Sequence, residues 1–188
     1  LLPQKQSEKG GAIVVADVNG DNKEDIFLAN AKGYRSKLFL QSNNGKFIET
    51  SREVFARDKM YEDNAGKFFD VDLDGDLDLY VASGSYEDLE QSEALVVRLY
   101  LNDGKGNFTK SAGILPKLYR VSQTIETSDI DLDGDKDVFV GGGVVPGKYP
   151  SSYPSLLLEN RKGKLIDKTE KTTKGFEKLR LVNDAVFA

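Results

Sequence analysis

The chain has no cysteine, no histidine and no tryptophan among its 188 residues. Without cysteine, disulfide bonds, thiolate nucleophiles and thiolate-ligated zinc are excluded. Without histidine, a Ser-His-Asp triad and imidazole metal sites are excluded as well. Any general acid or base must therefore be Asp, Glu, Lys or Tyr, and any bound metal must accept oxygen ligands, as Ca²⁺ and Mg²⁺ do.

Long apolar runs and an excess of basic charge are also missing. The longest apolar segments, such as 13–16, are far shorter than the roughly 20 residues that cross a bilayer, so we expect no membrane span. The formal net charge is −5 and no basic stripe carries interleaved aromatic residues, so we expect no nucleic-acid partner.

What the chain does have is an acidic segment that occurs three times. Residues 17–25, 70–78 and 129–137 align without gaps, and each is followed by an apolar, an aromatic and an apolar residue. The segments start 53 residues apart (17 to 70) and 59 residues apart (70 to 129). A period of this size indicates repeated supersecondary units.

A second pattern has the same period. Three apolar runs each lead through a glycine-containing turn into another apolar residue, which is typical of a β-hairpin. With one strand before and one strand after each acidic segment, every unit is expected to form four short strands. Helical periodicity is weak, with 88–97 as the best candidate. The hairpin runs are 38–40, 99–101 and 156–158.

Four-stranded antiparallel units at this spacing are what a β-propeller stacks, so we predict an all-β fold. We expect one partial propeller domain over 1–188, because three blades cannot close a ring. It would be an arc of a larger propeller of about seven blades, whose remaining blades would be partners of this arc. A β-sandwich with acidic turns is the alternative, which three in-register copies of both patterns disfavour. The predicted blades are 10–64, 65–123 and 124–180, and 181–188 is the predicted first strand of a further blade.

The acidic segments have the composition of cation-binding loops. Oxygen-bearing side chains at positions 1, 3, 5 and 9 of the nine-residue loop can reach one centre, and the backbone carbonyl of position 7 can add another oxygen. Ca²⁺ takes about 6–8 oxygen ligands, so we expect about three Ca²⁺ ions, with Mg²⁺ as the alternative. The predicted side-chain ligands are Asp17, Asn19, Asp21 and Asp25; Asp70, Asp72, Asp74 and Asp78; and Asp129, Asp131, Asp133 and Asp137. The predicted carbonyl ligands belong to Lys23, Asp76 and Asp135.

An EF-hand and a solvated acidic turn without an ion are the two alternatives for these loops. An EF-hand needs a bidentate Glu at position 12, where this chain has Leu28, Val81 and Val140. A solvated acidic turn without an ion leaves converging carboxylates that repel one another. Because Asn19 is neutral, we expect the first loop to bind its ion more weakly than the other two.

The connections on the opposite face of such a blade are rich in tyrosine. Six of the eight tyrosines fall there, and a tyrosine offers apolar area with a polar tip. We expect a protein or glycan ligand on this face, with the proline-rich segment 146–154 as the first choice. The alternative is that each tyrosine only packs its own loop. The candidate ligand-binding residues are Tyr34, Tyr86, Tyr149 and Tyr153.

No catalytic constellation is visible, so we favour a calcium-stabilised module for recognition or scaffolding over an enzyme. The alternative is part of a secreted glycan-acting enzyme, a hydrolase or lyase that uses paired carboxylates. Glu62 with Asp63, or Glu87 with Asp88, would be its candidates. Extracellular calcium modules often bind at about 10⁻⁴–10⁻³ M, so we expect an extracellular, cell-surface or periplasmic location.

Three segments also carry a resemblance to a known family: 11–21, 101–108 and 143–150. The chain resembles the FG-GAP/VCBS repeats of integrin α-subunit propellers and of many bacterial extracellular proteins. It is most similar to the bacterial VCBS-repeat proteins that carry an ASPIC/UnbV-type segment. The resemblance implies a calcium-binding propeller with the loop ligands named above. The Phe-Gly and Gly-Ala-Pro signatures of the integrin branch are missing, so its ligand binding in cell adhesion is not implied.

Overall fold

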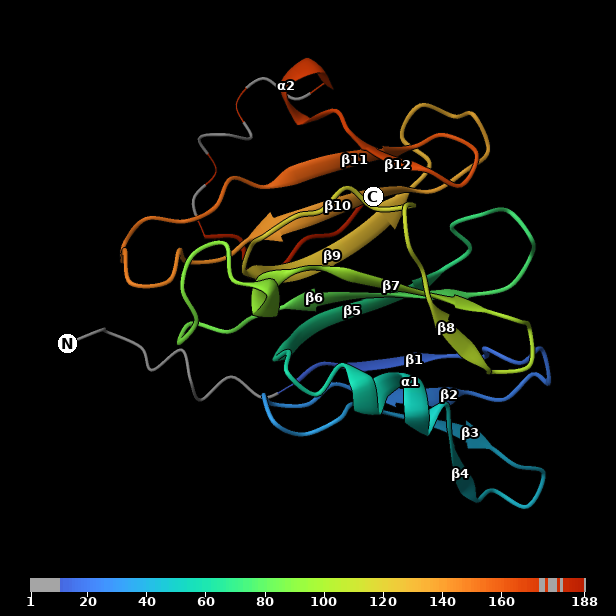
Figure 1. The fold of residues 1–188 in the computed structure, drawn as a ribbon. Coiled ribbons are helices and arrows are strands. Elements are labelled where there is room, and N and C mark those ends of the chain that lie inside the picture. Colours follow the sequence, from blue (N-terminus) through green and yellow to red (C-terminus); the bar gives the residue numbers. More distant parts are fainter. Residues whose placement is uncertain (1–10, 173–174, 176–178, 180, 188) are drawn as a thin grey trace.

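The structure is a computed structural model that describes residues 11–172, 175, 179 and 181–187. The all-β prediction is confirmed, because three four-stranded antiparallel sheets stand side by side as propeller-like blades (Figure 1). In every sheet the strand order follows the chain order, so each blade is an up-and-down meander. The described strands do not close into a barrel.

The three sheets are named here by their order along the chain. Sheet 1 contains β1 (Ile13–Ala16), β2 (Asp25–Leu28), β3 (Lys37–Gln41) and β4 (Phe47–Thr50). Sheet 2 contains β5 (Asp63–Phe69), β6 (Asp78–Ser83), β7 (Arg98–Asn102) and β8 (Phe108–Lys110). Sheet 3 contains β9 (Ser122–Ser128), β10 (Asp137–Gly142), β11 (Leu156–Asn160) and β12 (Leu165–Asp167).

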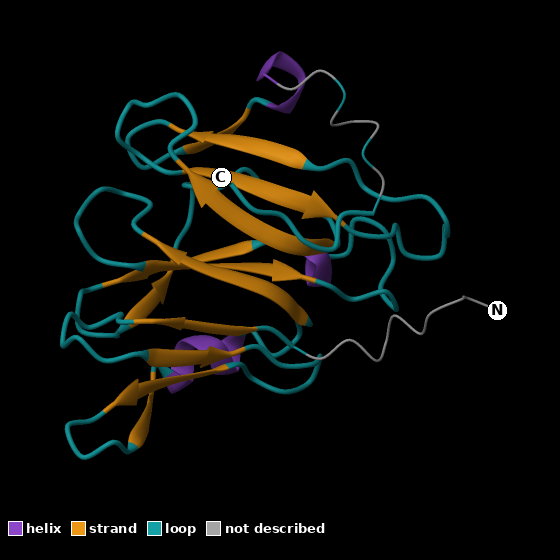
Figure 2. Ribbon diagram, turned by 180° about the vertical axis from the view of Figure 1, so that it is seen from behind, coloured by secondary structure: helices purple, strands orange, loops and turns teal. Residues whose placement is uncertain are grey.

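Helices are few and short, and they lie outside the sheets (Figure 2). They are α1 (Arg52–Arg57), the 3₁₀ turn η2 (Glu93–Leu95) and α2 (Thr169–Thr172). The weak helical candidate over 88–97 therefore contains only η2. Among the described residues, no helix is long and apolar enough to cross a membrane.

Each acidic segment connects the first two strands of its sheet, and each predicted hairpin forms the last two. The register places the ninth loop residue opposite the end of the first strand, as in the pairs Ala16–Asp25 and Phe69–Asp78. The predicted strand over 181–188 is not observed, because the described residues 181–187 contain none. The first strand of a blade takes its hydrogen bonds from the second strand, and 181–187 has no such partner in the described part of the chain. Its Val182 N–H instead donates to the carbonyl of Gly142 at 3.2 Å.

The hydrophobic core consists of two inter-sheet layers. The layer between sheets 1 and 2 contains Phe27 and Leu38 from one side and Phe68 and Phe108 from the other. Phe55 of α1 completes it, with its ring centroid 5.5 Å from that of Phe27. The layer between sheets 2 and 3 contains thirteen buried residues, from Ala65 to Leu165. The stack is therefore held mainly by apolar burial between neighbouring sheets.

The two end faces of the stack are less well covered than the layers inside it. Phe47 is 45% exposed, although its counterparts Phe108 and Leu165 in the other sheets are buried. Ile130 is 38% exposed, whereas its counterpart Val18 in the first acidic loop is 2% exposed. The positions that neighbouring sheets bury inside the stack thus face solvent at its ends.

A repeated hydrogen bond also joins neighbouring sheets. The side-chain amide of Asn102, at the end of β7, donates to the carbonyl of Val18 in the acidic loop of sheet 1 at 2.7 Å. Asn160, at the end of β11, donates in the same way to the carbonyl of Val71 in the acidic loop of sheet 2 at 2.8 Å. The first and second acidic loops are thus tied to the following blade as well as to their own.

The ninth residue of each acidic loop is a buried carboxylate that joins the loop to the second and third strands. Asp78 is 0% exposed, and its two oxygens accept the backbone N–H groups of Val71 at 3.0 Å and Asn102 at 2.9 Å. Asp25 and Asp137 repeat both contacts in sheets 1 and 3. The side chain therefore joins the start of the loop and the third strand to the second strand.

Replacing Asp78 by Ala leaves two buried N–H donors without an acceptor. The loss is partly offset because a buried charge is also removed, so we expect the free energy of unfolding to fall by about 2 kcal/mol. Denaturant unfolding in metal-free buffer measures this value. Asp74→Ala, at an exposed position of the same loop, is the control and should change it by less than about 0.5 kcal/mol. Equal losses in the two variants would contradict the assigned role of Asp78.

Candidate metal centre and the opposite face

The three acidic loops lie on one side of the stack, together with the hairpin turns of the three sheets (right side of Figure 1). Every loop has two residues with positive φ, at positions 4 and 6. In the second loop these are Leu73 (φ 66°) and Gly75 (φ 94°). Their N–H groups donate to the two oxygens of Asp70, at 2.7 and 3.0 Å. This backbone turn fixes the first carboxylate of the loop.

The second loop brings three predicted ligands together. One carboxylate oxygen from each of Asp70, Asp72 and Asp78 lies within 4.8 Å of the others. Burial, with Asp74 and Asp70 nearby, raises the pKa of Asp72. Burial also raises the pKa of Asp78 to about 6. Oδ1 of Asp72 is buried without a hydrogen-bond partner. The three carboxylates therefore lack a positive group that would compensate their charge.

The third loop has a similar cluster, formed by Asp129, Asp131 and Asp133. Their carboxylate oxygens also lie within 4.8 Å of one another. Asp135 is buried, and its Oδ2 accepts the Lys162 N–H at 3.2 Å while its Oδ1 has no partner. Burial and the charges of Asp133 and Asp137 raise the pKa of Asp135. The residues of the second and third loops therefore fit a hard cation such as Ca²⁺.

The first loop is different. No group of three carboxylates converges there in the part of the chain that the structure describes. Nζ of Lys23 lies 2.9 Å from Oδ2 of Asp21, so the loop supplies a cation of its own. Partial burial would raise the pKa of Asp17, but backbone N–H groups, including that of Asn22 at 2.7 Å, outweigh this and hold the pKa below its usual range.

The four candidate tyrosines lie on the connections opposite the loops, but in two different environments. Tyr34 and Tyr149 are 72% and 50% exposed. Tyr86 and Tyr153 are half-buried, and the hydroxyl of Tyr86 accepts a hydrogen bond from the side-chain amide of Gln123. The hydroxyl of Tyr153 is buried without a hydrogen-bond partner. The four side chains thus differ in how accessible they are to a ligand.

Tyr86 lines a cavity of about 380 Å³ between the connections of sheets 1 and 2. Glu62, Asp63 and Glu87 line the same cavity, which places both pairs of candidate catalytic carboxylates at or beside it. Burial, with the charges of Glu87 and Asp88, raises the pKa of Glu62.

Two ion pairs account for the other charges at this cavity. Asp63 pairs with the buried Arg98, and Asp88 lies 2.6 Å from Nζ of Lys32. Lys32 and Asn64 also line the cavity, although no motif singles them out.

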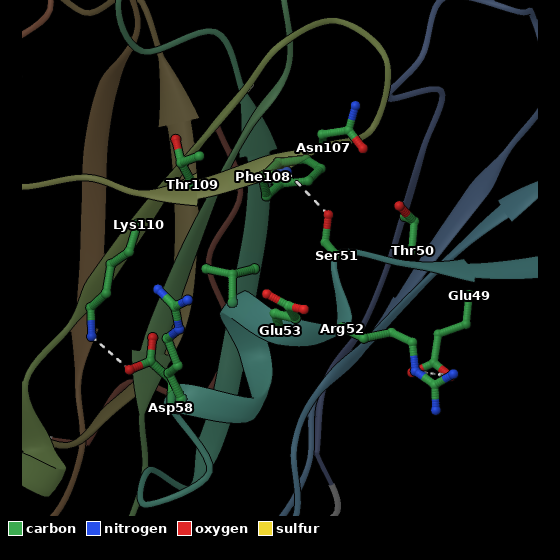
Figure 3. A pocket seen from close by; sticks show the side chains of 12 residues that line it. Glu49, Thr50, Ser51, Arg52, Glu53, Asp58, Asn107, Phe108, Thr109 and Lys110 are labelled. Atoms are coloured by element: carbon green, nitrogen blue, oxygen red, sulfur yellow. Dashed lines mark hydrogen bonds and ion pairs between the residues drawn. The ribbon is translucent and has the colours of Figure 1, made fainter.

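A larger hollow of about 770 Å³ lies between β4, α1 and β8 (Figure 3). Ser51, with φ 51°, accepts the Phe108 N–H at 3.1 Å and donates to the carbonyl of Gly106 at 3.1 Å. Asp58 pairs with Lys110 at 2.7 Å, and Glu49 pairs with two arginines. The contacts of Ser51 and Asp58 fasten the end of β4 and the end of α1 to sheet 2, so we assign the hollow a structural role.

Comparison with known proteins identifies the repeats. The model of the FG-GAP-like repeat matches the chain twice, over residues 17–81 and 70–140. A search of curated proteins found no significant match. The two matched segments begin at the first and second acidic loops and together cover well over half of the chain. The chain belongs to the FG-GAP-like repeat family.

Proposed function

We propose that this chain is a calcium-binding β-propeller module. The observation that carries the proposal is the convergence of three carboxylates in each of two loops: Asp70, Asp72 and Asp78 in the second, and Asp129, Asp131 and Asp133 in the third. Bound Ca²⁺ would neutralise these carboxylates and rigidify the turns between the first two strands of each blade. Extracellular calcium modules bind Ca²⁺ more weakly than cytosolic calcium sensors do. If the loops bind Ca²⁺ with such an affinity, they are occupied in an extracellular, cell-surface or periplasmic location, which is the location that we propose. The VCBS-like character of the repeats, most similar to ASPIC/UnbV-type proteins, is part of the same proposal.

Calcium should raise the thermal stability of the chain. At a tenfold excess over Kd, each site adds about 1.4 kcal/mol, so the unfolding midpoint should rise by several degrees over its value in EDTA. Differential scanning calorimetry in EDTA, Ca²⁺ and Mg²⁺ measures this, and Mg²⁺ should have the smaller effect. Identical midpoints in EDTA and Ca²⁺ would refute the proposal.

Calcium titrations should rank the first loop as the weakest site. Lys23→Asp removes the internal ammonium and supplies the residue found at the same position in the other two loops. It should tighten the first site by about tenfold in isothermal titration calorimetry. Lys46→Asp makes the same charge change in the neighbouring hairpin turn and serves as the control. An equal gain in both variants would indicate a general charge effect.

We propose that further blades of the same repeat pack against the two end faces of the stack. Phe47 and Ile130 are exposed there, although neighbouring sheets bury their counterparts. In a chain extended at its N-terminus by one more such repeat, Phe47→Asp should lower the free energy of unfolding by about 2 kcal/mol. In the 188-residue chain the same change should cost little. Equal losses in denaturant unfolding would count against a blade on this face.

The face opposite the loops is proposed to recognise a protein or a carbohydrate. The cavity beside Tyr86 supports a carbohydrate, because it combines an aromatic ring with carboxylate, amide and ammonium groups that can hydrogen-bond hydroxyls. A second candidate function, glycan cleavage, is favoured by one observation. Glu62, whose pKa burial raises, shares this cavity with Glu87.

An array of immobilised oligosaccharides tests both functions. Tyr86→Ala should weaken binding at least about tenfold, whereas Tyr119→Ala, outside the cavity, should not. Each bound sugar is then incubated with the protein and analysed by chromatography. An intact sugar favours the recognition module, and a shortened sugar that is lost in Glu62→Gln favours the hydrolase or lyase. An array on which Tyr86→Ala binds like the unmodified protein would refute a sugar site in this cavity.

A further inference from the structure

Sheet 2 contains a buried arginine, Arg98, and a second buried arginine, Arg120, lies just before the first strand of sheet 3. Arg98 of sheet 2 is 2% exposed, and a carboxylate balances its charge, although its Nε has no hydrogen-bond partner. It pairs with Asp63, donates to the Tyr100 hydroxyl at 3.2 Å and stacks with its guanidinium carbon 3.8 Å from the ring centroid of Tyr61. A buried charge needs such partners, because its transfer out of water costs several kcal/mol.

Arg120, just before β9, is compensated less: burial lowers its pKa and the charge of Asp167 opposes this, but no carboxylate is paired with it in the described part of the chain. It is 5% exposed. Its guanidinium donates to the carbonyl of Pro154, and Nε is buried without a partner. Burial lowers the pKa of Arg120 to about 10, which still leaves the group charged at neutral pH.

The alignment of the repeats explains the difference. Residues 120 and 122 of sheet 3 occupy the positions of Tyr61 and Asp63 in sheet 2, 59 residues earlier, which is the spacing of the acidic loops. Where sheet 2 has the carboxylate of Asp63, sheet 3 has Ser122, whose Oγ is buried and unpartnered. The third unit therefore has a buried arginine at the position of Tyr61 and no carboxylate at the position of Asp63.

Two further hydroxyl groups without partners surround this arginine. The ring centroid of Tyr153 lies 5.8 Å from its guanidinium carbon, and the Tyr153 hydroxyl is buried. Tyr80 is 0% exposed, and its hydroxyl also has no partner. Burial raises the pKa of Tyr80, and the charge of Arg120 opposes this rise. The phenol, serine and guanidinium groups can all donate hydrogen bonds, and buried polar groups of this kind are normally satisfied.

We propose that Arg120, Ser122, Tyr80 and Tyr153 form a buried site for one small monovalent anion of chloride size. All the unpartnered atoms can donate, whereas a cation would meet the charge of Arg120. The anion takes the place that the carboxylate of Asp63 fills in the preceding sheet. Because these atoms are enclosed, the anion stabilises the contact between sheets 2 and 3 and does not form an open ligand site.

The site is tested by comparing the thermal unfolding midpoint in chloride buffer with that in gluconate buffer of the same ionic strength. Calcium is supplied as calcium gluconate in both buffers. Chloride should raise the midpoint of the unmodified protein by about 3 °C, through binding to the folded state only. Ser122→Asp supplies the missing carboxylate, so it should be stable without chloride and lose the chloride response. Arg120→Met should also lose the response, and Lys117→Met, an exposed cation nearby, should keep it.

Crystals grown in bromide provide a direct observation. The expected result is an anomalous peak beside the guanidinium of Arg120 in the unmodified protein and none in Ser122→Asp. Water at this position, or a midpoint that is the same in chloride and gluconate, would overturn the proposal. A chloride response that persists unchanged in Ser122→Asp would also overturn it, even if Arg120→Met fails to fold.

Discussion

The buried carboxylate at the start of each second strand is the constraint on which the rest of the blade depends. Its two oxygens accept one N–H from the start of the acidic loop and one from the third strand, as Asp78 does with Val71 and Asn102. The loop is therefore closed by hydrogen bonds that involve no ion. A cation that binds the remaining carboxylates meets a turn that is already formed, which lowers the entropy cost of ordering it.

The same constraint reaches the next blade. The residue whose N–H binds the ninth carboxylate also carries the amide that crosses to the preceding loop, as in Asn102 and Asn160. One position thus joins the loop of its own sheet to the loop of the sheet before it. Disturbance of a loop should consequently weaken the contact between blades, because the two share a hydrogen-bonded residue.

Much of this architecture could be predicted from the sequence, because the repeat places the same residue types at the same loop positions three times. The four strands per unit, the acidic turns and the hairpins followed from that pattern. The role of Asn102 did not, because the first unit has Gln41 at that position and a contact between blades leaves no local signal. The packing of Phe55 between Phe27 and Tyr100 was equally invisible, since α1 is too short to show helical periodicity.

The loops were predicted to be equivalent apart from Asn19. The difference at a second position, Lys23, is also visible in the sequence, but the repeat pattern gave its side chain no role. Lys23 occupies the position at which the other loops have Asp76 and Asp135, and its ammonium lies on Asp21. A side chain expected to contribute only its backbone carbonyl therefore acts on the charge of the loop. Compensation from within the chain and compensation by a bound ion are alternatives, and the first loop relies partly on the former.

The units differ most on the face away from the loops, and the reason is geometric. From the ninth carboxylate to the residue whose N–H binds it there are 16 positions in sheet 1 but 24 and 23 in sheets 2 and 3. The extra residues lie in the connections between the second and third strands, which close no carboxylate cluster and can vary in length. The unequal arginine partners also lie at this end of the blades, since Asp63 and Ser122 begin β5 and β9. Repetition is thus preserved where a buried carboxylate demands fixed geometry, and the residues that distinguish one blade from another gather on the face where we propose that a ligand binds.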